Sequence, residues 1–279
     1  MLDVRKKACK VIACAHDKGG VGKTTTTANI LFVLSKNGFN VLGIDADPQG
    51  DLSKFFGIKN PHSLEKTLAS GMNAVIEEKS FDPTDFIQHN CEGVDFIPAN
   101  AELAATETTL VNSMNREYVM QEFIKPFRPY YDYILIDCRP SLGLTVVNAL
   151  TAADSLIIPV QAHKLAAEDM DGLFKTVGRI KQRPNPALKV DGIIMTMVDS
   201  RTTLAWKTIH EVQSKYGNLV RVFDTKIPFG IKAAEIPGDG KSIFTYAPNS
   251  KVAKAYEQLT KEVQDIGKLE RKAKNSDAR

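Results

Sequence analysis

A glycine-rich segment near the start of the chain constrains the fold more than any other feature. It reads Asp17-Lys18-Gly19-Gly20-Val21-Gly22-Lys23-Thr24-Thr25. The usual phosphate-binding pattern, G-x-x-x-x-G-K-[ST], requires glycine where this chain has Asp17, and a second lysine, Lys18, stands beside it. The apolar run Val11–Ala15 precedes the segment, and Thr25–Lys36 is typical of a helix. A strand, a loop and a helix in this order predict a nucleotide site.

Each residue type in this loop suits an anion. The three glycines, at 19, 20 and 22, can adopt backbone angles closed to other residues, so successive amides can turn inward as an anion nest. The helix that follows adds the partial positive charge of its N-terminus. Lys23 can reach the terminal phosphates, and the Thr24 hydroxyl can ligate Mg²⁺. ATP or GTP is therefore the expected ligand.

The additional lysine admits two roles. Lys18 can contact the phosphates of its own subunit or those bound by a facing subunit, and the second role implies a nucleotide-dependent dimer. Residues 18–24 match K-G-G-x-G-K-[ST] throughout and thereby resemble the deviant-Walker-A ATPases, the ParA/MinD class, in which the early lysine reaches across the dimer. The resemblance implies catalytic roles for Lys18 and Lys23. It also implies a set of ATP contacts: Lys18, Gly19, Gly20, Val21, Gly22, Lys23, Thr24, Thr25 and Pro228.

Length and composition are those of an ordinary globular protein. The chain has 279 residues, of which 43% are hydrophobic and 25% charged, so a single ATPase domain over residues 1–279 is expected, with a polar tail from about residue 267. No run approaches the ~20 apolar residues of a membrane span, and the N-terminus lacks the apolar region of a signal peptide. The sequence therefore predicts a cytoplasmic protein.

The cysteines show neither a C-x-x-C pair nor the spacing of metal ligands, which predicts buried free thiols. This weakens the relation to iron–sulfur members of the class, since a cluster that bridges two subunits needs dedicated, exposed cysteines. The four cysteines are Cys9, Cys14, Cys91 and Cys138.

Apolar runs alternate with helical segments along the chain. Near-continuous apolar strands joined by helices predict an α/β fold, a mostly parallel twisted sheet with helices on both faces. By resemblance it is a P-loop NTPase of the ParA/MinD (SIMIBI) class. The segment Phe55–His89 is the least regular and is expected to form helices and loops over one edge. Besides Val11–Ala15, the expected strands are Val41–Asp45, Val94–Pro98, Tyr133–Asp137, Ser155–Val160, Val190–Val198 and Val220–Ile227.

Acidic residues lie at the ends of two of these strands. Ligands bind beyond the carboxyl ends of such strands, so Asp45, Asp47 and Asp137 are candidates, although a lone carboxylate there is often only a helix cap. Residues 45–50 resemble the D-x-D-P-Q-G switch of the ParA class, which implies that Asp47 orients or activates the attacking water and that Asp45 supports the Mg²⁺ shell.

The segment that begins at Asp137 resembles a Walker B and switch II motif, often D-x-P-P-S, and Asp137 is the implied outer-shell Mg²⁺ ligand. The expected metal residues are therefore Thr24, Asp45 and Asp137. Three residues depart from the class pattern, and the sequence leaves their roles open: Asp17, Asp51 and Arg139.

Positive charge gathers toward the end of the chain. The net charge is +3, but from residue 175 onward 20 Lys and Arg face 11 Asp and Glu, a footprint compatible with nucleic acid and also with a solvated basic face. Asp199–Thr203 resembles the D-x-R-T loop that supplies a DNA-contacting arginine in ParA proteins. The resemblance implies that Arg201 and Lys232 contact phosphates without reading sequence. The alternative is that both are ordinary exposed charges.

The C-terminus separates two branches of the class. MinD-like members hold membranes through a C-terminal amphipathic helix. Here an apolar stripe at helical spacing between Ser250 and Ile266 is expected to pack on the body, and Lys268–Lys274 contains a single large apolar residue. The sequence therefore favours a protein with no membrane contact.

These observations favour a ParA/Soj-type partition ATPase. We expect slow, Mg²⁺-dependent ATP hydrolysis, an ATP-bound homodimer that binds DNA nonspecifically on the nucleoid, and release when a ParB-like centromere-binding protein stimulates hydrolysis. Two alternatives stay open, a MinD-like positioning ATPase and a fold-related ATP-dependent metabolic ligase. The ligase would need a small-molecule pocket beside the γ-phosphate.

Overall fold

The computed structural model describes residues 9–163, 166–230 and 239–277, and from residue 268 onward the backbone alone. Within this part, seven strands form one sheet in the order β3-β4-β2-β5-β1-β6-β7. Neighbouring strands are parallel, except that β3 runs antiparallel to β4. This confirms the mostly parallel sheet. The strands are β1 (Lys10–Cys14), β2 (Val41–Ala46), β3 (Gln88–His89), β4 (Asp95–Ile97), β5 (Tyr133–Cys138), β6 (Ser155–Gln161) and β7 (Lys189–Thr196).

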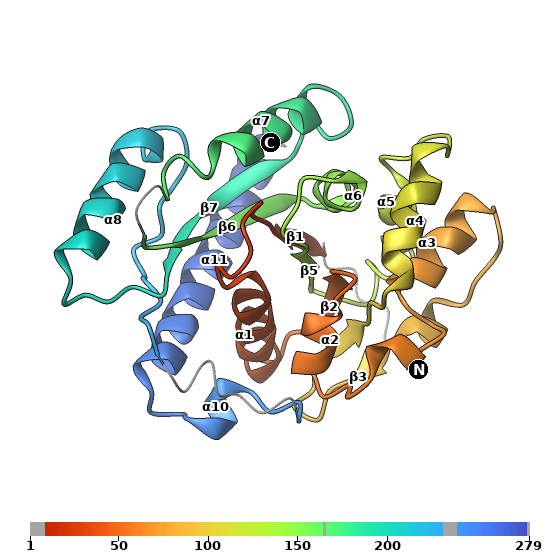
Figure 1. Ribbon diagram of the computed structural model, residues 1–279, viewed down its shortest axis with the longest axis horizontal. Coiled ribbons are helices and arrows are strands. Elements are labelled where there is room, and N and C mark those ends of the chain that lie inside the picture. Colours follow the sequence, from red (N-terminus) through yellow and green to blue (C-terminus); the bar gives the residue numbers. More distant parts are fainter. Residues whose placement is uncertain (1–8, 164–165, 231–238, 278–279) are drawn as a thin grey trace.

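Helices pack on both faces of this sheet (Figure 1). Side chains alternate between the faces of a strand, and in β1 Val11 and Ala13 join one core cluster while Ile12 joins the other. The first cluster includes α3 (Leu68–Ile76), α4 (Glu102–Val111), α5 (Val119–Ile124), α6 (Leu144–Ala152), α7 (Asp171–Gln182) and α8 (Thr203–Tyr216). The second includes α1 (Lys23–Lys36), α2 (Asp51–Phe55), α10 (Ile243–Tyr246) and α11 (Lys251–Asp277).

The strand expected at Val220–Ile227 does not form as a regular strand. The segment pairs with β7 at one isolated parallel bridge, between Ile193 and Val222, and a second bridge joins Val198 and Pro228 just beyond both segments. Between them, the backbone N–H groups of Asp224 and Thr225 donate to the carboxylate of Glu262 in α11, at 3.1 and 2.9 Å. A side chain from another layer thus takes hydrogen bonds that a continuous strand would make to β7, and the expectation was wrong for that reason.

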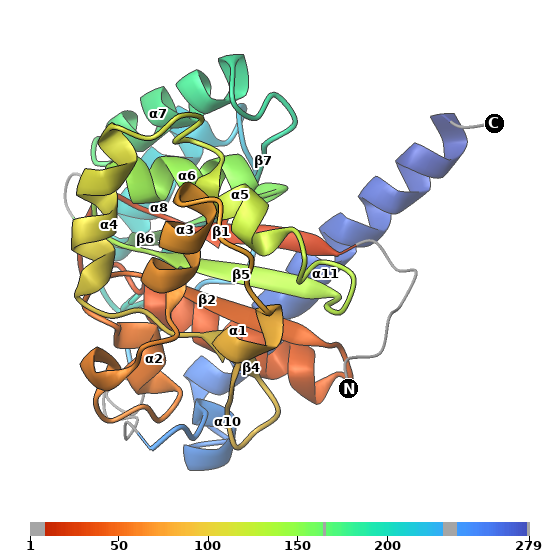
Figure 2. The same cartoon turned by 90° about the vertical axis from the view of Figure 1, so that its right-hand side faces the viewer.

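Short and terminal segments complete this architecture. The sequence does not predict β3, whose two polar residues pair antiparallel with β4. The helix α11 continues to Asp277, past residue 267, where the sequence predicts a polar tail, and Figure 2 shows its last turns extending beyond the body. Two 3₁₀ helices, η1 (Pro61–Ser63) and η2 (Pro83–Phe86), lie with α3 in the irregular region 55–89.

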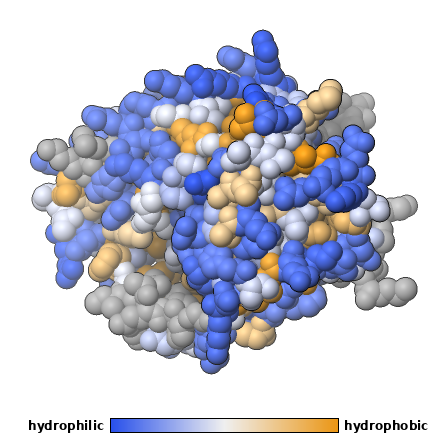
Figure 3. All heavy atoms as spheres, turned by 45° about the vertical axis from the view of Figure 1, so that its right-hand side comes forward, coloured by the Kyte–Doolittle hydropathy of each residue, from blue (hydrophilic) through white to orange (hydrophobic). Residues whose placement is uncertain are grey.

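The surface seen in Figure 3 is mostly hydrophilic, with apolar residues in small patches. None of the helices in the described ranges has both the length and the apolar character that a membrane crossing requires.

Strand register brings the predicted site residues to one edge of the sheet. In the ladder, Asp45 of β2 pairs with Asp137 of β5, and Asp137 pairs with Cys14 of β1. The glycine-rich loop begins directly after β1 and ends in α1. The carboxyl ends of three adjacent strands therefore meet where a ligand is expected in an α/β sheet.

Candidate nucleotide site

The glycine-rich loop is held in shape by its own side chains and by β7. Gly20 and Gly22 have φ angles of 73° and 87°, in the left-handed region that glycine adopts without a steric penalty. The ammonium group of Lys23 donates to the carbonyl oxygen of Lys18 at 2.7 Å, across the loop. The Thr196 hydroxyl, at the end of β7, donates to the Val21 carbonyl at 2.8 Å. These backbone conformations are compatible with the anion nest that the sequence predicts.

A buried histidine orders the entry to this loop. The backbone N–H of Lys18 donates to His16 Nδ1 at 3.0 Å. Burial lowers the pKa of His16 to about 4, so the ring is neutral and carries its proton on Nε2. Nδ1 is also 3.0 Å from Asp17 Oδ1, but a neutral ring makes no ion pair there. No motif in the sequence points to His16, since its role is a backbone contact.

Asp17, whose role the sequence leaves open, lies beside the start of α7. A Cβ atom placed on Gly172 would come within 3.1 Å of Asp17 Oδ2. The carboxylate therefore occupies space against α7, and Gly172 leaves room for it.

Lys18 is paired within its own chain. Its Nζ atom lies 2.5 Å from Oδ2 of Asp169, and the same oxygen lies 3.5 Å from His163 Nε2. The Lys18 side chain is 42% exposed, so its ammonium group is both held and accessible. Asp169, far along the chain in the segment before α7, is not identified by any sequence motif.

The two strand-end carboxylates differ in their hydrogen bonding. Asp45 accepts from the Ser53 N–H at 2.8 Å, the Ser53 hydroxyl at 2.7 Å and the Asp47 N–H at 3.1 Å. Burial raises its pKa to about 6. Both oxygens of the buried Asp137 make no hydrogen bond within the described part of the chain. Burial and the nearby Asp45 raise the Asp137 pKa well above its usual value, while Thr24 and Lys23 oppose the rise.

This donor set fits Mg²⁺. A buried carboxylate with unused oxygens is costly without a cation, and Mg²⁺ takes carboxylate and hydroxyl oxygens together with waters and phosphates. Asp137 and the Thr24 hydroxyl are the groups that could hold it. The oxygens of Asp45 accept hydrogen bonds from Ser53 and Asp47. This carboxylate therefore connects the switch segment 45–50 to α2.

Asp47 lies at the start of this switch segment and is half-buried. Its Oδ1 atom accepts from the Gln49 N–H at 3.0 Å. Asp51, four residues on, is exposed and pairs with Lys54 at 3.1 Å, within the short helix α2. Asp51 therefore interacts with its own helix, whereas Asp47 remains near the carboxyl ends of the strands.

Arg139 also has a defined partner. Its guanidinium pairs with Glu107 Oε2 of α4 at 2.5 Å, and Glu107 Oε1 accepts from the Thr145 N–H of α6 at 3.2 Å. The residue that replaces the commoner proline of the switch II pattern thus ties this loop to α4 and α6.

Comparison with known proteins identifies the family. A family model described as an AAA domain matches residues 9–190. The sporulation initiation inhibitor protein Soj of Bacillus subtilis is 38% identical over 255 residues, which cover 91% of this chain and 98% of Soj. The chain belongs to the ParA/Soj-type P-loop ATPases.

Other relatives agree. The chromosome partitioning protein ParA of Myxococcus xanthus is 36% identical over 254 residues, covering 91% of this chain and 87% of that one. Among solved structures, cobyrinic acid a,c-diamide synthase from Mycobacterium smegmatis, with a bound ATP analogue and magnesium, superposes with a TM-score of 0.81 at 32% identity, covering 93% and 96% of the two chains. The relatives support a partition ATPase, and the structural neighbour shows that the fold also occurs in a synthase.

The loop expected to bind DNA in this ParA/Soj-type chain follows β7. Arg201 is exposed and makes a two-point ion pair with Asp199, at 2.9 Å from Nε and 2.8 Å from a terminal nitrogen. Pro228 forms an isolated bridge with Val198, so its segment lies beside the start of this loop. Lys232 lies outside the described residues.

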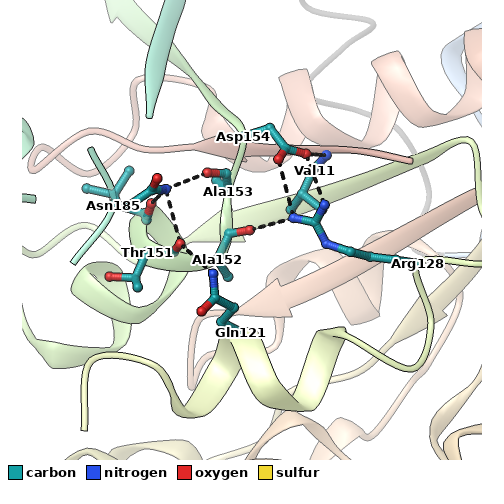
Figure 4. Close-up of polar contacts among 9 residues, drawn as sticks. Val11, Gln121, Arg128, Thr151, Ala152, Ala153, Asp154 and Asn185 are labelled. Atoms are coloured by element: carbon teal, nitrogen blue, oxygen red, sulfur yellow. Dashed lines mark hydrogen bonds and ion pairs between the residues drawn. The ribbon is translucent and has the colours of Figure 1, made fainter. Parts of the chain in front are cut away.

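A cavity of about 920 Å³ lies at the opposite edge of the sheet, among the N-terminal ends of β1 and β5 and the C-terminal ends of α6 and α7. Its polar groups serve the fold (Figure 4). The two N–H groups of the Asn185 side-chain amide are shared among the carbonyls of Leu150, Thr151 and Ala153 at the end of α6. Arg128 contacts Asp154 and the Ala152 carbonyl. The cavity is thus separate from the nucleotide site.

Proposed function

We propose that the chain is an ATP-dependent DNA-segregation ATPase. ATP joins two copies face to face, the dimer binds DNA nonspecifically, and a ParB-like centromere-binding partner stimulates hydrolysis and release. The observation that carries the proposal is the side chain of Lys18, which is 42% exposed at a loop that holds a second lysine, Lys23. One nucleotide can be bound with a single lysine in this loop. The second lysine is therefore available to the nucleotide that a second copy binds.

The residues of the site would have different roles in ATP hydrolysis. The loop amides, Lys23 and the N-terminus of α1 would bind and orient the phosphates. Mg²⁺, held by Thr24 and Asp137, would supply charge neutralisation on the phosphates. Asp47 would accept a hydrogen bond from the attacking water. Its Oδ1 atom accepts from the Gln49 N–H, which leaves the other carboxylate oxygen available to this water.

A mechanical connection supports coupling between ATP and DNA. Thr196 holds the Val21 carbonyl of the nucleotide loop, and the next residue, Met197, has a left-handed φ of 51° that is uncommon for a side chain of this kind. Two residues further on begins the Asp199–Arg201 pair. A change in the nucleotide loop would therefore reach the DNA-binding loop through a short, constrained segment.

A synthase activity is the second candidate function, because the chain superposes on the Mycobacterium smegmatis synthase with a TM-score of 0.81. It requires a substrate pocket beside the γ-phosphate. The cavity of about 920 Å³ in the described part of the chain lies at the other edge of the sheet. Lys18 and the Asp47 switch favour the partition ATPase.

A duplex-DNA titration tests the proposal. The full chain is titrated onto a labelled DNA of unrelated sequence with ATP, ADP or no nucleotide, each at two salt concentrations. We expect binding with ATP alone, weakened steeply by salt because phosphate contacts release counterions. Equal binding in all three nucleotide states, or none with ATP at low salt, would refute the proposal.

A further inference from the structure

Three large apolar side chains lie on the segments next to the Arg201 loop. Leu204 and Trp206 of α8 are each 49% exposed, and Phe229 is 65% exposed. They make up three of the seven large hydrophobic side chains that are exposed in the described ranges. We call Arg201, Leu204, Trp206 and Phe229 the Arg201 surface.

Backbone and side-chain contacts bring this surface to one loop. The Trp206 indole N–H donates to the Ser200 carbonyl at 3.0 Å, which places the ring against the residue before Arg201. The Phe229 N–H donates to the Val198 carbonyl at 3.1 Å, so the backbone of Phe229 lies beside the start of this loop. The indole has already satisfied its only donor, and its remaining exposed surface is apolar.

The charges of the surface favour an anion. The Arg201 side chain is 86% exposed, and Thr202 caps the N-terminus of the 14-residue helix α8, whose first turn contains no acidic residue. Lys207 is exposed on the next turn. Asp199 is the acidic group that faces Arg201. A ligand that pairs phosphates with apolar sugar faces matches this combination better than a purely apolar or purely anionic one.

We propose that Trp206 and Leu204 pack on the deoxyribose of the DNA backbone while Arg201 contacts an adjacent phosphate. The proposal rests on the proposed function, since it extends the DNA-binding surface of that function. The anchored indole loses little side-chain freedom on binding, so its apolar contact area contributes to affinity at a small entropic cost.

The two kinds of contact separate by their dependence on salt. Log affinity falls with log salt concentration, and removing one phosphate contact makes this slope less steep by about one unit. Removing an apolar contact instead lowers the affinity by the same factor at every salt concentration. With ATP, Trp206→Ala is expected to weaken duplex binding roughly fivefold at each salt with an unchanged slope, and Trp206→Phe to retain most of the affinity. Arg201→Ala is expected to reduce the slope.

Trp206 also provides its own signal, because it is the single tryptophan of the chain. In the wild type, duplex DNA added with ATP is expected to change the intrinsic tryptophan fluorescence. Leu219→Ala is the matched control, since Leu219 is 77% exposed just beyond the same helix and outside the Arg201 surface. It is expected to bind DNA as the wild type does. ATP binding and thermal melting verify that each variant is folded.

Two results would overturn the assignment while leaving the proposed function intact. One is wild-type DNA affinity in Trp206→Ala together with unchanged wild-type fluorescence. The other is loss of the ATP-bound dimer in Trp206→Ala by light scattering, which would assign the surface to a protein contact. Absence of DNA binding by the wild type in every nucleotide state would overturn the proposed function itself, and the assignment with it.

Discussion

The ammonium group of Lys18 lies 2.5 Å from the carboxylate of Asp169 in the same chain. A lysine that serves a facing nucleotide must leave this partner first. The pair therefore opposes dimerisation by the free energy needed to separate it. For a partly exposed ion pair that free energy is on the order of 0.2 to 1 kcal/mol.

Replacing Asp169 is expected to favour the dimer. Asp169→Asn removes the charge that holds Lys18, so the ATP concentration at which half the protein is dimeric should fall about two- to fivefold. Light scattering across an ATP titration measures it. Asp171→Asn is the control, because Asp171 pairs with Lys215 at 2.8 Å instead. A requirement for more ATP in Asp169→Asn would show that the carboxylate assists the dimer.

Stability should depend on pH through His16. Burial lowers its pKa from 6.5 to about 4, so between these values the unfolded chain binds a proton that the folded chain does not. The free energy of unfolding should therefore fall as pH drops from 6.5 to 4, by on the order of 2 to 3 kcal/mol, and the loss is absent above pH 6.5.

The variant His16→Asn isolates this effect. Asparagine can accept from the Lys18 N–H but does not titrate. The raised pKa of Asp45 acts in the opposite direction in both proteins, so the difference between them reports His16. Urea unfolding at pH 4.5 and pH 7 measures it, and the same pH dependence in both proteins would count against a neutral, buried ring.

Asp47→Ala is expected to separate ATP binding from hydrolysis. Without the carboxylate that orients the attacking water, ATP turnover should fall roughly 100-fold, while ATP binding and dimerisation persist. Phosphate release and light scattering measure the two properties. Asp51→Ala is the control, because Asp51 pairs with Lys54 on the helix that follows. Near-normal hydrolysis by Asp47→Ala would remove Asp47 from the catalytic role.

Asn185 should stabilise the fold without affecting the nucleotide. The two N–H groups of its side-chain amide are shared among three carbonyls at the end of α6, so Asn185→Ala is expected to cost about 1 to 2 kcal/mol of unfolding free energy. Asn185→Asp should cost more, since a carboxylate accepts only and is repelled by the helix C-terminus. Urea unfolding ranks the variants, and equal stability of Asn185→Asp and the wild type would contradict the capping role.

The sequence predicts the parts of the structure that local patterns determine. The strands that contain Asp45 and Asp137 and the loop around Lys23 follow from apolar runs and a motif, and the structure brings them to one edge of the sheet. The sequence does not reveal contacts between distant segments. Asp169 beside Lys18 and Glu262 interrupting the last expected strand both depend on helices whose positions only the packed fold determines.

Lys18→Ala compared with Lys23→Ala tests most directly whether Lys18 connects ATP to dimerisation. Each variant is titrated with a fluorescent ATP analogue, and its mass is measured by light scattering with ATP. We expect Lys18→Ala to bind the nucleotide nearly as well as the wild type but to stay monomeric, whereas Lys23→Ala loses the nucleotide. An ATP-bound dimer of Lys18→Ala at wild-type concentrations would contradict this connection.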